Sequence, residues 1–255
     1  MSTPCTHVIV NTKQPSRRRL SVSLAHSEED ILECQKLRYH VFAEEMGVKL
    51  KSAKPGLDQD RFDPHCKHLI VRDHITGKVV GTTRLLTDED AVNSGMFYSE
   101  TEFKLAPILN MNGRFMEVGR TCIHPENRGG ATLAMLWQGL AQIVMLNKID
   151  YLIGCASIPL CHGDSYIQSI LAYLHRHHMS PPNLRATPLI PLPRRDAVCS
   201  EEVILPTLLK GYLRQGAIIC GEPYWDAAFN VADVFVLLDR DRLSRRYARH
   251  FMTGT

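Results

Sequence analysis

Acidic and basic side chains at short spacing form the most informative group in this sequence. The run Asp58-x-Asp60-x-x-Asp63 packs three like charges into a short segment, which costs energy unless cations or a cationic ligand compensate them. Arg38 and Phe42 are four residues apart, so they share one face of an expected helix. Together with three later charged residues they predict a charged site. The full group is Arg38, Phe42, Asp58, Asp60, Asp63, Arg84, Glu117 and Arg120.

A second feature is a glycine-bearing segment, residues 123–132, between an expected strand and an expected helix. Its glycines let the backbone approach a ligand closely, and the first N–H groups of a helix favour a phosphate or pyrophosphate. A strand–Gly-Gly–helix junction is also an ordinary turn, so the segment alone is weak evidence. The candidate phosphate-binding residues are His124, Arg128, Gly129, Gly130 and Ala131.

Histidines and cysteines invite two further interpretations, both of which we disfavour. Residues 65–68 and 175–178 are rich in histidine, but structural zinc sites use stricter ligand spacings. The second run also ends an amphipathic helix, where cations complement the helix dipole. A covalent route through Cys122 or Cys155 lacks an evident His or Asp partner in the sequence. We therefore expect no metal and no cysteine nucleophile.

Hydrophobic periodicity indicates which elements must position these residues. Ser27 and Asp30 form a capping box that opens a helix, and Gly47 supplies its end. Residues 48–64 have the composition of a long loop. If residues 115–123 form a regular central strand, Glu117 lies on the face opposite to Arg120. Further strands are expected at 68–72, 78–86, 151–156, 217–220 and 231–238, and further helices after Gly130, at 165–178 and at 205–215.

These elements intermix, with a hairpin first and a strand–helix–strand unit in the middle, which favours an α/β fold with a mixed sheet. The length of 255 residues allows one large domain or a core with an appendage. We expect an N-terminal arm or edge strand at residues 1–26 and a single domain at 27–255. Within that domain, the core spans about 27–180 and a C-terminal elaboration about 181–255.

Composition excludes several classes of protein. Hydrophobic residues make up 44% and charged residues 22%, which are ordinary globular values. A net charge of +3 is too balanced to indicate nucleic-acid binding, although the basic runs at 17–19 and 245–249 suit an acidic partner or anionic lipid. We see no secretory signal or apolar span, and the eight scattered cysteines suggest a reduced, cytoplasmic protein.

The glycine-bearing segment resembles the donor-binding loop of the GNAT N-acyltransferase superfamily, whose pattern is Gln/Arg-x-x-Gly-x-Gly/Ala. Glu126, Gly129 and Ala131 occupy those positions here, and Glu126 is a departure. An acid would repel the 3′-phospho-ADP of coenzyme A, whereas phosphopantetheine on acyl carrier protein has only one phosphate to place. The resemblance therefore favours an acyl carrier protein thioester as donor substrate, with no permanently bound cofactor.

The charged group resembles acyl-homoserine-lactone synthases, a branch of the same superfamily with the pattern Arg-x3-Phe, Glu-x-Asp-x2-Asp, a later Arg, and Glu-x-Ser-Arg. Asp58, Gly119 and Val48 depart from that pattern, which argues against a quorum signal as product. Ornithine N-acyltransferases are more similar. Their motifs match in the stretches 117–125, 136–140, 154–157, 208–216 and 220–247.

That resemblance implies a GNAT fold with a mixed, mostly antiparallel sheet flanked by helices. It implies transfer of a 3-hydroxyacyl chain from acyl carrier protein to the α-amine of L-ornithine, giving lyso-ornithine lipid. The product is a lipid, so a peripheral contact with the inner face of the membrane is also expected. The rival functions are synthesis of another N-acyl amino acid or an acyl-homoserine-lactone-type signal, and a non-catalytic lipid-binding module.

In such a reaction the amine must lose a proton, and a carboxylate can take it directly or through one water. Glu117 is the first choice for this base and Asp58 the second. Arg38, Arg84 or Arg120 would bind the ornithine carboxylate. The three aspartates would bind its second ammonium. The structural alternatives stay open: an internal salt-bridge network for the aspartates, and pairing of Glu117 with Arg84 or Arg120.

Overall fold

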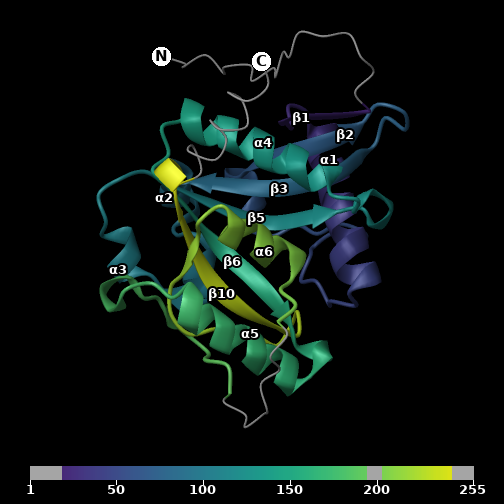
Figure 1. The fold of residues 1–255 in the computed structure, drawn as a ribbon. Helices are drawn as coiled ribbons and strands as arrows, with labels where there is room; N and C mark the ends of the chain where they lie inside the picture. The colour runs from purple at the N-terminus through teal and green to yellow at the C-terminus, as the bar shows by residue number, and fades with distance from the viewer. Residues whose placement is uncertain (1–18, 194–202, 243–255) are drawn as a thin grey trace, which may run out of the picture. The chain divides into compact units, whose positions relative to one another are not determined.

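The computed structural model describes residues 19–193 and 203–242 (Figure 1). The described chain forms two compact units that interleave along the sequence. The first unit contains the described residues up to Leu85 and the stretch Arg120–Ile143, and the second contains Leu86–Gly119 and the described residues from Val144 onward. The sequential division at about residue 180 stays a prediction. The basic stretch 245–249 and residues 17 and 18 of the other basic run lie outside the described residues.

The first unit contains an antiparallel sheet whose middle strand is β2 (Lys67–Asp73). Strand β1 (Leu20–Leu24) pairs with one edge of β2, which places an edge strand at the end of the expected arm. Strand β3 (Val79–Thr87) follows β2 through the expected hairpin and pairs with its other edge. Helix α4 (Ala131–Leu146) lies close to this sheet, because a Cβ at Gly139 would come within 2.6 Å of Val22.

Helix α1 (Glu28–Tyr39) begins with the expected capping box between Ser27 and Asp30. A turn of π-helix, η1 (His40–Glu45), continues it, and Gly47 ends it with φ 73°. The π-helix was not expected. The following loop closes with the short 3-10 helix η2 (Asp63–His65). One face of α1 packs on an apolar cluster formed by Cys34, Leu37, Val41, Ile70, Val79 and Cys122.

The second unit is built around the long antiparallel pair of β6 (Tyr151–Pro159) and β10 (Val231–Asp239). Strand β5 (Phe115–Ile123) pairs in parallel with β6 through Phe115–Glu117, and its last four residues belong to the first unit. Strand β10 also pairs with two short strands, β8 (Ile218–Ile219) and β9 (Tyr224–Asp226). Two longer helices complete this unit, α5 (Asp164–His177) and α6 (Thr207–Arg214).

The predicted strands and helices are confirmed with small shifts of their ends, and the sheet pairings described are antiparallel except for β5–β6. The expected mixed α/β class is therefore confirmed. The sequence analysis missed several short elements that lack a periodic pattern. They are α2 (Asp88–Ser94), η3 (Tyr98–Thr101), β4 (Phe103–Lys104), α3 (Ala106–Leu109), η4 (Pro125–Asn127), η5 (Leu160–His162), η6 (Pro182–Leu184), β7 (Thr187–Pro188) and β9.

Strand β5 is not regular, which corrects the expected alternation of its faces. Arg120 has φ 51°, in the left-handed region that a non-glycine residue rarely adopts. Residues 115–118 are all buried, so burial does not alternate there either. The expectation that Glu117 and Arg120 lie on opposite faces assumed a regular strand, and that assumption was wrong.

The lengths of the helices also show whether any of them could span a membrane. Within the ranges 19–193 and 203–242, each helix falls short of the length and apolar character that a membrane span needs.

Candidate active site

Six of the charged residues form one cluster in the first unit, which we call the acid–arginine ring: Arg38, Asp58, Asp60, Asp63, Arg84 and Arg120. Arg38, fully buried on α1, is its centre. Its Nε donates to Asp58 Oδ2 at 2.8 Å, and its Nη1 donates to Asp63 Oδ1 at 2.8 Å. A further Arg38 N–H donates to the backbone carbonyl of Asp58. The buried guanidinium is thus held by charge-assisted hydrogen bonds.

The other two arginines close the ring. Arg84 Nη1 lies 2.7 Å from Asp60 and 3.2 Å from Asp63. Arg120 lies 3.4 Å from Asp58 and 3.4 Å from Asp60. Each aspartate therefore contacts two arginines, and the charges alternate around a closed circuit. The sequence analysis left open an internal salt-bridge network for the three aspartates, and these contacts form such a network.

Local structure explains why the ring forms. The N–H of Asp60 donates to Asp63 Oδ2, which folds the acidic segment back at the start of η2. Desolvation of Asp63 is outweighed by its hydrogen bonds and by the charges of Arg38 and Arg84, so its pKa is lowered. His68 is buried 3.7 Å from Asp63, and burial together with Arg38 lowers its pKa to about 4. Phe42 packs on the apolar cluster of α1.

Glu117 lies in the second unit, buried on β5. Its Oε2 accepts a hydrogen bond from the N–H of Tyr98 at 2.6 Å, and its Oε1 accepts from the N–H of Ser99 at 2.8 Å. The Ser99 hydroxyl also donates to Oε1. These bonds order the first turn of η3. These hydrogen bonds of Glu117 all go to η3.

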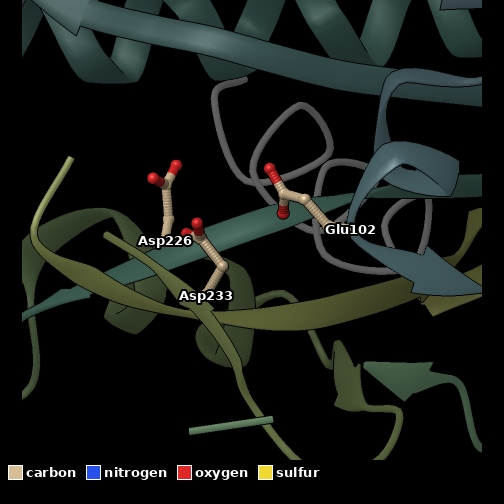
Figure 2. Close-up of side chains that lie close together, drawn as sticks. All are labelled: Glu102, Asp226 and Asp233. Atoms are coloured by element: carbon tan, nitrogen blue, oxygen red, sulfur yellow. The ribbon is translucent and has the colours of Figure 1, made fainter. Parts of the chain in front are cut away.

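A cluster that the sequence analysis missed lies in the same unit: Glu102, Asp226 and Asp233, which we call the carboxylate triad (Figure 2). One carboxylate oxygen from each lies within 4.8 Å of the others. Glu102 and Asp233 are each 4% exposed, and Asp226 is half-buried. The last two belong to the stretch 220–247 that resembles ornithine N-acyltransferases. Glu102 follows η3, in a segment without a sequence pattern.

The glycine-bearing segment is exposed, with open backbone. Gly130 has φ 92°, and nothing lies within 4 Å of a Cβ built on Gly129 or Gly130. His124 caps η4 and stacks on His40. Arg128 makes a bidentate ion pair with Glu45 at 2.5 and 2.6 Å, so its charge is already compensated. Helix α4 begins at Ala131, directly after this exposed segment, and binding of a phosphate by its first N–H groups stays a prediction.

The thiols do not suit covalent catalysis. Burial raises the pKa of Cys122 and of Cys155 above the usual value, which disfavours the thiolate that acts as nucleophile. Among the residues that the structure describes, the side chains close enough to share an ion are those of the triad, and not the histidine runs 65–68 and 175–178.

Comparison with known proteins agrees with this architecture. Residues 37–138 match the model of an acetyltransferase (GNAT) domain. FeeM, an N-acyl amino acid synthase from uncultured soil microbes, aligns over 89% of this chain and 94% of its own, with 10% identity and a TM-score of 0.53. The acyl-homoserine-lactone synthase LasI aligns over 87% of this chain and 90% of its own, with 14% identity and a TM-score of 0.52. Fold and domain define an acyltransferase of the GNAT class.

The sequence narrows this class. The L-ornithine N(alpha)-acyltransferase of Rhodobacter capsulatus is 36% identical over 91% of this chain and 94% of its own. That of Agrobacterium fabrum is 34% identical over 91% and 85%. The chain belongs to the L-ornithine N(alpha)-acyltransferase family. The acyl-homoserine-lactone synthases share only the fold, so the signal-synthase alternative is not favoured.

Proposed function

We propose that this enzyme transfers an acyl chain from a thioester of acyl carrier protein to the α-amine of L-ornithine, giving lyso-ornithine lipid. The observation that carries the proposal is 36% identity, over nearly the whole chain, to a relative named for that acceptor. The acyl chain that we propose is a 3-hydroxyacyl chain. We also propose a peripheral contact with the inner face of the membrane, through which the lipid product would enter the bilayer.

The reaction needs a neutral amine. Its nitrogen attacks the thioester carbonyl, the C–N bond forms, the C–S bond breaks, and the thiolate leaves and takes up a proton. We assign Glu117 as the group that receives the amine proton, directly or through one water. Hydrogen bonds from the N–H groups of Tyr98 and Ser99 hold this carboxylate in one orientation, and bonds from neutral donors stabilise the charged form less than arginine charges do. Asp58 is the weaker candidate because Arg38 and Arg120 already compensate it.

The substrate roles first expected of the acid–arginine ring need revision. Arg38 and Arg84 are almost fully buried, and each spans two aspartates. Arg120 has the most exposed side chain of the three, with 15% of it accessible. We therefore propose that Arg38 and Arg84 hold the loop 48–66 in place, while the binding of an acceptor carboxylate by Arg120 stays a prediction from the sequence.

The donor assignment rests on the start of α4. Backbone N–H groups suit a single phosphate, while Glu126 is exposed beside them and Arg128 is tied to Glu45. Glu126 would repel the additional phosphates of coenzyme A. We therefore expect phosphopantetheine on acyl carrier protein to be preferred.

The test incubates the purified protein with L-ornithine and either a 3-hydroxyacyl carrier protein or the matching acyl-coenzyme A. We expect thiol release with the carrier protein and a product whose mass is that of N-acylornithine. No thiol release above the blank with ornithine would refute the acceptor. Equal or better activity with coenzyme A would refute the donor alone.

A further inference from the structure

The carboxylate triad differs from an ordinary surface acid cluster in the burial of its members. Glu102 and Asp233 are each more than nine-tenths buried. Glu102 Oε2 is inaccessible and has no hydrogen-bond partner among the residues that the structure describes. A buried carboxylate oxygen without a partner is costly, because it has lost water and gained nothing in exchange. Figure 2 shows the three carboxylates gathered together, with that of Glu102 among them.

The electrostatic environment of the triad favours a cation. Burial, followed by the charge of Asp233, raises the pKa of Glu102 to about 8. The same three carboxylates help to raise the pKa of Tyr224 on β9, after burial itself. The two aspartates are held by protein donors: Asp226 Oδ1 accepts from the N–H groups of Ala228 and Phe229, and Asp233 Oδ1 accepts from the Ser157 hydroxyl.

The triad also connects with the group that we assign as the base. Ser99, which donates to Glu117, lies 3.3 Å from the Sγ of Cys155 on β6. Cys155 in turn faces the carboxyl group of Glu102, whose pKa it lowers against the larger effect of burial. All of these residues belong to the second unit. The polar chain therefore runs from Glu117 through two side chains to Glu102.

We propose that Glu102, Asp226 and Asp233 bind the side-chain ammonium of the acceptor amino acid. This inference rests on the proposed function and assigns its specificity for a dibasic substrate. A primary ammonium has three donors in tetrahedral directions. With hydrogen bonds of about 2.85 Å, its acceptors lie about 4.6 Å apart, which the 4.8 Å limit on the oxygens of the triad admits.

The test compares L-ornithine with L-norvaline, which has the same carbon chain without the side-chain amine. In the wild type, kcat/KM for thiol release should favour ornithine strongly. Asp226→Asn and Glu102→Gln should each reduce that preference by about 10- to 100-fold, as expected for a lost charge-assisted hydrogen bond. Glu222→Gln, an exposed acid of the same segment, is the matched control and should keep the preference.

A second measurement needs no variant. The groups facing Glu102 are Asp233 on β10, Asp226 on β9, Cys155 on β6 and Tyr98 on η3. An ammonium arriving among them displaces the proton of Glu102. Calorimetric titration at pH 7, in buffers of different ionisation enthalpy, should show release of nearly one proton per ornithine bound and none per norvaline.

The outcomes separate the two proposals. A wild type that releases no thiol with ornithine refutes the proposed function. A wild type that uses ornithine, with triad variants that keep the preference or with no proton release, refutes only the triad assignment. If ornithine preference disappears on treatment with a chelator and returns with Mg²⁺ or Ca²⁺, the triad is a metal site and the ammonium assignment is wrong.

Discussion

In the acid–arginine ring each of three aspartates contacts two arginines, whereas Glu102 in the carboxylate triad faces two further acids. The ring combines carboxylates from one short segment with arginines from distant parts of the chain, whereas the triad brings distant carboxylates together. The ring satisfies its charges internally, and the pKa of Asp63 is lowered. In the triad, Glu102 Oε2 has no hydrogen-bond partner within residues 19–193 and 203–242, and the pKa of Glu102 is raised. The two pKa shifts differ in direction because arginines face Asp63, whereas burial and a second acid act on Glu102.

This difference changes where the acceptor specificity is sought. Three aspartates at close spacing looked like an ammonium site in the sequence, and they proved to be compensated. In the triad, Glu102 lies more than 120 positions from Asp226 and Asp233, and each acid alone is unremarkable in the sequence. A cluster of charged residues therefore indicates a ligand only when the protein itself does not already supply the opposite charges.

The largest expected effect comes from breaking the ring. Arg38→Met removes the fully buried guanidinium and leaves Asp58 and Asp63 each with one arginine. Loss of one partner from a buried ion pair costs about 3–5 kcal/mol, and urea unfolding should show a loss of that size. The matched control is Arg72→Met, whose more accessible pairs with Asp30 and Glu33 should cost about 1 kcal/mol or less. Equal losses of unfolding free energy in the two variants would show that the ring stabilises the fold no more than an exposed ion pair does.

Much of the fold could be predicted because local rules acted without competition. The capping box at Ser27, the hairpin before β3 and the bounds of β5 follow from residue type and spacing. The π-helix η1 and the positive φ of Arg120 depend on tertiary packing, which overrides the regular pattern. The ring residues were identified as a group, but the sequence could not show that the two signs satisfy each other. Glu102 was missed because its partners lie on strands that only the fold brings near.

The triad should make the stability of the folded protein fall as pH rises, because Glu102 is protonated in the folded state. Its folded pKa of about 8 lies above the ordinary value of 4.5, so the folded state binds the extra proton between these values. Stability without ligand is therefore fully present below about pH 4.5 and falls as pH rises towards 8. Glu102→Gln removes this fall. Relative to the wild type, the variant should gain about 3–4 kcal/mol between pH 5 and pH 8.

Urea unfolding of Glu102→Gln at both pH values measures this gain, and the difference between them cancels any pH-independent cost of the amide. Glu222→Gln should show no such gain, because Glu222 is exposed. A variant whose stability relative to the wild type is the same at pH 5 and pH 8 would contradict a protonated Glu102 and would remove the contrast between the two regions.

The smallest expected effect belongs to His68, whose buried ring lies beside the acid–arginine ring. Its folded pKa of about 4 lies below the ordinary 6.5, because of burial first and then the charge of Arg38. The unfolded chain therefore binds the extra proton between these values, and stability is lost as pH falls from 6.5 to 4. At pH 5 this loss amounts to about 1–2 kcal/mol, and His68→Gln should abolish it. His74→Gln, at an exposed position, should leave the pH profile of the wild type unchanged. If His68→Gln keeps the full acid slope, the slope comes from the aspartates of the ring, and the neutral histidine contributes nothing to it.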